Sequence, residues 1–237
     1  MKKIKIFFLP YAGASTTVYY AWKKDIAPQY ELIFIDLPGH GSRADEKFCS
    51  DIDEAVKNIV EVIKSEVHDG DKYLIFGHSM GALLAYETYY KLLNLNLQIP
   101  MHIIVSGKNS PEVPLSRKIE KLEDYDFVEK ISELGGLPSE FYNKEVMQIF
   151  LPILRSDFWI LENYKYIKRN IKMSCDLTIL FAKDDQSTNE EGINLWSNHT
   201  SGKCNFYEFS GNHFFIFECY KEVTNIINKI LLDLKDK

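Results

Sequence analysis

The fold of this chain is decided by the stretch Tyr73-Leu74-Ile75-Phe76-Gly77-His78-Ser79-Met80-Gly81-Ala82-Leu83-Leu84-Ala85-Tyr86. An apolar run typical of a buried strand leads into Gly-x-Ser-x-Gly, and a run typical of a helix follows. In this context the pattern forms a nucleophile elbow, which holds the serine in a strained turn at the end of a strand. Gly77 and Gly81 suit such a turn because a Cβ there would clash with the closely passing backbone. We therefore expect Ser79 to be a nucleophile; the alternative is a purely structural turn.

Outside this stretch, short apolar runs alternate with amphipathic runs of helical period. This alternation predicts an α/β fold with a mostly parallel central sheet flanked by helices. Near-continuous apolar strands are expected when helices cover both faces of the sheet. The expected strands are residues 5–9, 32–36, 73–76, 103–106, 177–182 and 205–209. The expected helices are residues 18–26, 51–67, 82–93, 192–198 and 220–234, the second beginning after Ser50.

The alternation stops between about residues 110 and 172, where no convincing strand is found. A segment of this length inside a compact domain is commonly a lid or a binding loop. We expect residues 1–237 to form one domain with this helical lid inserted. Short helices are expected because the segment is broken by Pro111, Pro114, Gly135-Gly136, Pro138 and Pro152. Some large apolar side chains would line a substrate cleft and the others would pack the insertion onto the sheet: Phe127, Leu134, Phe141, Phe150, Leu154, Phe158 and Trp159.

The composition is that of an ordinary globular protein and excludes several functions. Of the 237 residues, 46% are apolar and 26% are charged. A net charge of −6 argues against a nucleic-acid partner, which basic proteins bind by neutralising phosphates. No apolar stretch reaches the roughly 20 residues that a membrane span needs. The cysteines are scattered without metal-type spacing, so we expect reduced thiols and a cytoplasmic protein: Cys49, Cys175, Cys204 and Cys219.

A serine hydroxyl needs a general base before it can act as a nucleophile. In α/β hydrolases the partners follow in the chain order Ser, Asp or Glu, His. Asp184 and Asp185 follow the fifth expected strand and His213 follows the sixth, so all three should lie at the sheet edge that carries Ser79. We expect His213 to take the Ser79 proton, and a carboxylate to fix the imidazole tautomer. The residues alone leave the choice between the two aspartates open.

An oxyanion hole needs backbone N–H groups aimed at the developing negative charge. One would come from Met80, the residue after the nucleophile. The other would come from the loop after the first strand, Pro10-Tyr11-Ala12-Gly13-Ala14, where we favour the N–H of Tyr11 and place that of Ala12 second. The alternative is that this loop is a plain glycine turn.

Together with the elbow, segments spread over nearly the whole chain resemble type II thioesterases, the stand-alone editing hydrolases of nonribosomal peptide and polyketide synthesis. The segments are Phe7-Phe8-Leu9-Pro10-Tyr11-Ala12-Gly13-Ala14-Ser15, Asp36-Leu37-Pro38-Gly39-His40-Gly41-Ser42-Arg43, Leu151-Pro152-Ile153-Leu154-Arg155-Ser156-Asp157-Phe158 and Phe209-Ser210-Gly211-Asn212-His213-Phe214-Phe215. The Pro-Gly-x-Gly and Gly-His-Ser-Met-Gly pieces occur in many α/β hydrolases. The insertion segment and the His-Phe-Phe ending are more specific to this family.

The resemblance implies the roles of three side chains. It makes Ser79 the nucleophile and His213 the base, and the family's Gly-x-x-Asp pattern makes Asp185 the acid. Three positions depart from the family pattern: Ala182 stands for the glycine before the acid, Asn212 for a second glycine before the histidine, and Gly13-Ala14 for a glycine pair in the early loop.

The resemblance also implies the reaction, which is hydrolysis of short or aberrant acyl groups from the phosphopantetheine arm of carrier proteins through an acyl-Ser79 intermediate. No metal or organic cofactor is required, and the partners are acyl- or peptidyl-carrier protein domains. We expect a monomer, because the site needs nothing from a second subunit. If docking is partly electrostatic, the candidate basic residues are Lys118, Lys121, Lys130, Lys165, Lys168 and Arg169.

Two other functions fit part of the pattern. A general carboxylesterase or lipase-like hydrolase would share the same three side chains and fold. A non-catalytic binding module with a hydrolase fold is disfavoured because Ser79, Asp185 and His213 are all present.

Overall fold

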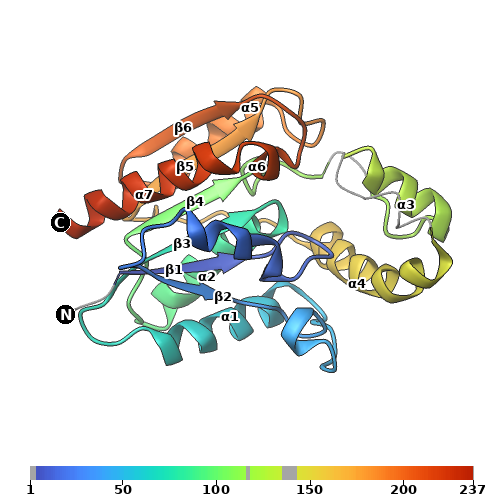
Figure 1. Ribbon diagram of the computed structural model, residues 1–237, viewed down its shortest axis with the longest axis horizontal. Helices are drawn as coiled ribbons and strands as arrows, with labels where there is room; N and C mark the ends of the chain where they lie inside the picture. Colours follow the sequence, from blue (N-terminus) through green and yellow to red (C-terminus); the bar gives the residue numbers. More distant parts are fainter. Residues whose placement is uncertain (1–3, 116–117, 135–142, 237) are drawn as a thin grey trace.

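A six-stranded sheet forms the centre of the molecule (Figure 1). The computed structural model describes residues 4–115, 118–134 and 143–236. The strands are β1 (Ile4–Leu9), β2 (Glu31–Phe34), β3 (Lys72–His78), β4 (His102–Ser106), β5 (Asp176–Ala182) and β6 (Cys204–Phe209). Their order in the sheet is β2-β1-β3-β4-β5-β6, and every pairing is parallel. The parallel sheet expected from the sequence is therefore confirmed.

Helices cover both faces of this sheet. One face carries α1 (Ile52–Glu66), α2 (Met80–Asn94), α5 (Glu190–Asn194) and the 3₁₀ helix η4 (Leu195–His199). The other face carries the 3₁₀ helix η1 (Thr16–Lys24), α6 (Phe215–Glu218) and α7 (Tyr220–Asp236). A further short 3₁₀ helix, η2 (Gly41–Arg43), lies in the loop after β2. No helix within the described residues is long and apolar enough to span a bilayer.

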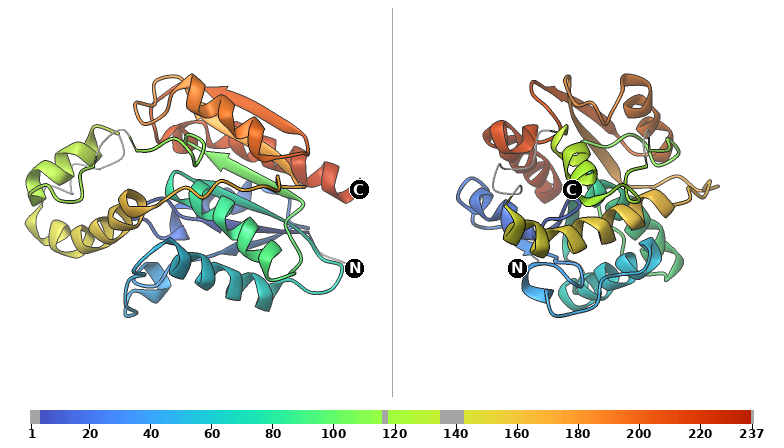
Figure 2. Two further views of the ribbon diagram at one scale, coloured as in Figure 1. Left: turned by 180° about the vertical axis from the view of Figure 1, so that it is seen from behind. Right: turned by 90° about the vertical axis from the view of Figure 1, so that its right-hand side faces the viewer.

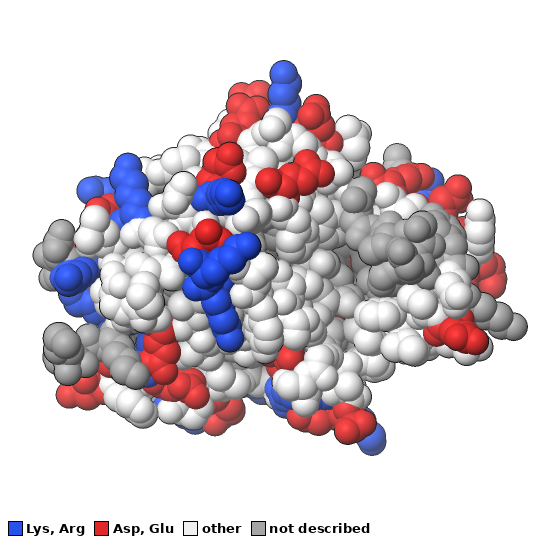
Figure 3. Space-filling model, in the orientation of Figure 1, with Lys and Arg blue, Asp and Glu red and all other residues white. Residues whose placement is uncertain are grey.

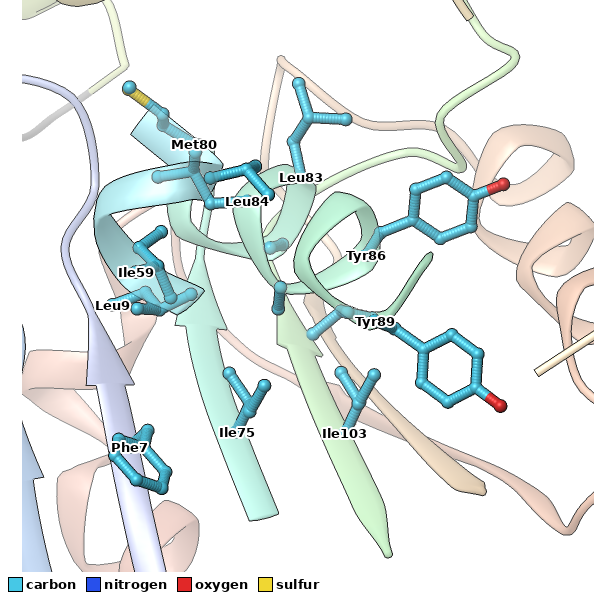
Figure 4. Close-up of a cluster of buried hydrophobic side chains, with 14 of the residues drawn as sticks. Phe7, Leu9, Ile59, Ile75, Met80, Leu83, Leu84, Tyr86, Tyr89 and Ile103 are labelled. Carbon is cyan, nitrogen blue, oxygen red and sulfur yellow. The ribbon is translucent and has the colours of Figure 1, made fainter. Parts of the chain in front are cut away.

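Alternate residues along the strands point to opposite faces of the sheet and contribute to two separate cores, as the two-residue period of a strand requires. Phe7, Ile75 and Ile103 pack under α1 and α2, as Figure 4 shows, whereas Phe8 and Leu74 pack under η1 and α7. All five side chains are fully buried, and burial of each stabilises the fold by about 1.5–3 kcal/mol. Helix α2 is buried on nearly all sides, so the turn that precedes it is fixed in place.

Helix ends differ from the sequence expectation in places. Asp51, not Ser50, caps α1: its side chain accepts the Glu54 N–H, while the Ser50 N–H and hydroxyl bind the Glu54 carboxylate. The first expected helix is 3₁₀ and begins two residues early. The β-branched residues in its first turn disfavour α-helix. Helix α6 was not expected, because it has only four residues.

The insertion, residues 110–172, stands at the carboxyl edge of the sheet (Figures 1 and 2). Among the described residues of the insertion, the helices are α3 (Asp124–Ser132) and α4 (Lys144–Asn163). The expectation that Pro152 breaks this region is wrong, since α4 continues through it for 20 residues. The proline ring is exposed and does not collide with the core. Gly135-Gly136 and Pro138 lie outside the described residues.

The insertion has a small core of its own, made by Ile119, Phe127, Val128, Ile131 and Leu154. The second half of α4 joins the main core instead, through Ile160 and Leu161. Helix α4 therefore contributes to both the insertion's own core and the main hydrophobic core.

Candidate active site

The turn between β3 and α2 has the strained geometry of an elbow. Ser79 has φ of 54° and ψ of −112°, a left-handed conformation that a non-glycine residue rarely adopts. A Cβ on Gly77 would lie 2.0 Å from the carbonyl oxygen of Gly81, and one on Gly81 would lie 2.6 Å from that of Leu9. Both flanking glycines are thus required. The Ser79 N–H donates to the Ser106 carbonyl at 2.7 Å, which ties the turn to β4.

His213 and Asp185 form a buried hydrogen-bonded pair. The distance from His213 Nδ1 to Asp185 Oδ2 is 2.8 Å, and the two residues are 3% and 4% exposed. Ser187 completes the group: its hydroxyl and N–H both donate to Asp185 Oδ1, at 2.6 and 2.9 Å. Burial raises the pKa of Asp185, but the hydrogen bonds from His213 and Ser187 outweigh it and hold that pKa below its usual value. Asp184 is exposed, so the structure brings Asp185 to the histidine.

The elbow and the His213 loop meet at the carboxyl edge of the sheet. The ring of His78 lies 4.8 Å from the ring of His213, and its Nδ1 is 2.9 Å from the Ser106 hydroxyl. Gly107 makes room for both rings, because a Cβ there would lie 2.5 Å from His78 Cε1 and 3.3 Å from His213 Cε1. Burial, then the charge of His213, holds the pKa of His78 well below its usual value, so this ring is neutral.

The loop after β1 passes over the start of α2. A Cβ on Gly81 would meet the carbonyl oxygens of Leu9 and Pro10, at 2.6 and 2.8 Å. Met80 is the first residue of α2, so its N–H has no intrahelical acceptor. The Tyr11 ring packs edge-on against His78 at 5.9 Å and against the ring of Phe214. Burial raises the pKa of the Tyr11 hydroxyl to about 12. The structure thus brings this loop, including Ala12, beside the elbow.

A cavity of about 420 Å³ lies between the loops after β4 and β5 and the insertion. Ser187 lines it, so the cavity adjoins the His213–Asp185 pair. Its wall is formed by Lys108, Asn109, Val113, Pro114, Leu115, Ile119, Lys130, Glu133, Leu134, Phe158, Gln186, Ser187, Thr188 and Asn189. Lys108 also lines an adjoining cavity of about 240 Å³. Burial, partly opposed by the charge of Asp185, lowers the pKa of Lys108 to about 8.

The large apolar residues of the insertion divide between a cavity wall and internal packing. Leu134 and Phe158 line the 420 Å³ cavity. Phe127 and Leu154 are buried in the insertion's own core. Trp159 is half-exposed and donates its indole N–H to the Ser50 carbonyl. Phe150 lines a separate small cavity near Gly13, and Phe141 lies outside the described residues.

Sequence reasoning missed several residues near this site. Ser187 had a local signal, because a serine two residues after an aspartate commonly bonds back to it. Lys108 had only its place after an expected strand. Asp157 and His40 form a buried pair at 2.9 Å, but 117 residues separate them and no motif links them.

Comparison with known proteins decides the family. The family model of the thioesterase domain matches residues 4–233. This chain belongs to the thioesterase family. Gramicidin S biosynthesis protein GrsT of Aneurinibacillus migulanus is 29% identical over 231 residues, which cover 97% of this chain and 89% of the relative.

Two solved thioesterase-fold structures match nearly the whole chain. The structure of ClbQ, from the colibactin NRPS/PKS pathway, has a TM-score of 0.93 at 27% identity and covers 99% of each chain. BorB, the type II thioesterase of the borrelidin biosynthetic cluster, has a TM-score of 0.85 at 28% identity and covers 96% of this chain and 92% of its own. The α/β-hydrolase fold and the thioester hydrolase activity expected from the sequence are confirmed.

Proposed function

We propose that this thioesterase is an editing enzyme that removes short or aberrant acyl groups from the phosphopantetheine arm of carrier proteins. One observation carries the proposal: the Ser79 elbow lies beside the buried His213–Asp185 pair, at the sheet edge that the insertion faces. The names of similar proteins support the substrate class, since BorB is a type II thioesterase and GrsT serves gramicidin S biosynthesis.

In the first half of the proposed reaction, Ser79 becomes acylated. His213 Nε2 removes the hydroxyl proton as Ser79 Oγ attacks the thioester carbonyl, and Asp185 stabilises the imidazolium from Nδ1. The N–H groups of Met80 and of Tyr11 or Ala12 would receive the oxyanion. The tetrahedral intermediate collapses, the carbon–sulfur bond breaks, and the imidazolium returns its proton to the departing thiolate.

In the second half, water takes the place of the thiol. His213 removes a proton from water as the oxygen attacks the acyl-Ser79 carbonyl, and the same donors receive the new oxyanion. Collapse returns the proton to Ser79 Oγ and releases the acyl group as a carboxylic acid. Apart from the substrate and water, every step uses side chains and N–H groups of this chain.

The 420 Å³ cavity is the proposed acyl site, and the insertion is the proposed lid of a one-domain enzyme. The volume of this cavity falls within the roughly 300–1,000 Å³ of small-ligand pockets. Apolar side chains of the insertion, among them Val113, Leu134 and Phe158, suit an alkyl chain, while Ser187 from the loop after β5 connects the cavity to His213.

Carrier docking is proposed at the surface around the insertion. Two of the six basic candidates are engaged elsewhere: Arg169 pairs with Glu87 at 2.7 Å and lies over the Tyr90 ring, and Lys130 pairs with Glu133. On the face seen in Figure 3, charges of both signs are interspersed. The exposed candidates that continue to support docking are Lys118, Lys121, Lys165 and Lys168. A monomer in the cytoplasm remains our proposal.

The experiment compares three substrates that carry the same acetyl group: an acetyl-loaded carrier protein, acetyl-CoA and a simple oxygen ester. Mass spectrometry follows loss of acetyl from the carrier, with Ser79→Ala as the matched control. We expect Ser79-dependent deacylation that is fastest on the carrier. Slow carrier turnover with fast ester hydrolysis would replace the proposal with a general esterase. Failure of Ser79 to react with a fluorophosphonate would indicate a non-catalytic binding module.

A further inference from the structure

The loop that would supply the second oxyanion donor is held by two carboxylates from different parts of the chain. At one end, Asp36 accepts the N–H and hydroxyl of Thr16, both at 2.7 Å, and those of Ser42, both at 2.9 Å. At the other, Asp157 Oδ2 accepts the Gly13 N–H at 2.7 Å. Asp36 follows β2 in the core of the fold, whereas Asp157 lies on α4 of the insertion. The insertion therefore takes a direct part in placing this loop.

Gly13 is the point at which α4 lies on the loop. Its φ of +82° favours glycine, and a Cβ there would lie 2.3 Å from Leu154 Cδ2. Beside this contact is a cavity of about 250 Å³, lined partly by Gly13, His40 and Phe150. Because the side chains of Leu154 and Asp157 on α4 lie directly against the Gly13 backbone, a shift of α4 would change the position of the loop.

Asp157 also binds His40, and the geometry fixes the protonation of that ring. His40 Nε2 lies 2.9 Å from Asp157 Oδ2, and His40 Nδ1 lies 3.0 Å from the Pro38 carbonyl oxygen. Both ring nitrogens face acceptors, so both must carry protons and the ring is an imidazolium. Both side chains are almost completely buried, which strengthens the interaction between the opposite charges.

The surroundings of His40 agree with this protonation. Burial lowers the pKa of His40, but the hydrogen bond and charge of Asp157, with the Pro38 carbonyl, outweigh it and raise that pKa. The charged groups that face the ring are Asp157 from α4 and Asp36 from the end of β2, and the ring of Phe48 packs against it edge-on at 6.0 Å.

We propose that Asp157 is a positioning residue: together with protonated His40, it fastens the Tyr11–Ala12–Gly13 backbone to the insertion and so holds the oxyanion donors in place. This inference rests on the proposed function. When His40 loses a proton, the carboxylate keeps the remaining one on Nε2, because a lone pair there would face a negative charge. The lone pair is then left at Nδ1, facing the Pro38 carbonyl oxygen. The ring's contact with Pro38 is therefore complete below the raised pKa of His40 and is lost as pH rises through it, while Asp157 continues to hold Gly13.

The substitution Asp157→Asn separates charge from shape. The amide has nearly the same volume, and its oxygen can take the place of Oδ2, where it accepts both the Gly13 N–H and the His40 Nε2–H. We therefore expect Asp157→Asn to keep most of the wild-type kcat. Asp157→Ala removes the acceptor. We therefore expect kcat to fall about tenfold at all pH values, and KM to change by less than about twofold.

One control separates this contact from the general packing of α4. Trp159→Phe removes another bond between α4 and the core, to the Ser50 carbonyl, without touching Gly13, and it should keep the wild-type kcat. A kcat of Asp157→Ala equal to that of the wild-type protein, or a fall of the same size in Asp157→Asn or Trp159→Phe, overturns the proposal.

Hydrogen exchange measured by NMR gives a readout that does not depend on activity. The Gly13 amide should exchange slowly in the wild-type protein and in Asp157→Asn, and faster in Asp157→Ala, which lacks the acceptor. Equal exchange in the wild-type protein and Asp157→Ala overturns the proposal even if every variant hydrolyses thioesters. If the wild-type protein hydrolyses none while the Gly13 amide is protected, the proposed function fails and the contact stands. Thermal unfolding of each variant identifies any that fails to fold.

Discussion

Replacing Asp185 with asparagine should stop catalysis almost completely while leaving the fold intact. Asp185 Oδ1 accepts two hydrogen bonds from Ser187, and Oδ2 accepts one from His213 Nδ1. In Asp185→Asn, the amide oxygen stays on the Ser187 side, because turning it away would lose two bonds of about 1 kcal/mol each. The NH₂ group then points at His213 Nδ1, which must present its lone pair. The proton moves to Nε2, which can no longer accept the Ser79 proton.

The expected size of this effect follows from the hydrogen bonds. A preference of about 2 kcal/mol for the wrong tautomer leaves only a few per cent of the histidine able to act as a base. Loss of the negative charge beside the imidazolium adds to this. The same substitution in a serine-protease triad lowers kcat about 10⁴-fold, so we expect a fall of about 10³- to 10⁴-fold, or roughly 4–5.5 kcal/mol.

The assay is steady-state hydrolysis of an acyl thioester, followed by release of the free thiol. Asp184→Asn is the matched control, since Asp184 is the neighbouring carboxylate and is exposed. The control should keep kcat within about twofold of wild type, as surface substitutions usually do little. A kcat for Asp185→Asn within tenfold of wild type, or an equal loss in Asp184→Asn, would refute the reasoning.

Two further substitutions test how the site is supported. Gly81→Ala should lower both kcat and the melting temperature, because the new Cβ would lie 2.6 and 2.8 Å from the backbone oxygens of Leu9 and Pro10; a variant as active and as stable as wild type would contradict the elbow geometry. Asp36→Asn should reduce the free energy of unfolding at pH 7 by about 1–3 kcal/mol, measured by urea denaturation. Burial raises the pKa of Asp36, but hydrogen bonds from Thr16 and Ser42 hold it below its usual value. Its contribution is therefore present above the unfolded pKa of about 4 and is lost as pH falls through the folded pKa, so the variant and wild type should converge in acid.

The elements that the sequence predicted correctly are those with a local cause. The apolar run before Gly77 is long enough to be a buried strand, and β3 covers it. The elbow glycines were predicted from crowding, and a Cβ at either position would lie within 3 Å of backbone atoms. Asp185 and His213 were predicted to lie at the same edge of the sheet because parallel strands end on the same side. Whether they and Ser79 act as a catalytic group stays a prediction.

What the sequence could not predict depends on contacts between distant segments. Pro152 reads as a helix break, yet its ring lies on the exposed side of α4, and the helix is held by burial of residues after it. Asp157 and His40 lie in two segments that carry the family resemblance, but the sequence did not predict their pairing, because it depends on how the insertion lies on the loop after β2. The choice of Asp185 over Asp184 needed the family resemblance, since both follow the same strand.

The most direct test of the central claim is a search for the acyl-enzyme itself. The protein is mixed with an acyl-loaded carrier, quenched with acid within milliseconds and digested. The mass of the peptide that contains Ser79 is then measured by mass spectrometry. We predict that this peptide gains the mass of the acyl group, that the gain decays as free acid appears, and that Ser79→Ala shows neither. Loss of the acyl group from the carrier at an unchanged rate in Ser79→Ala would contradict the account.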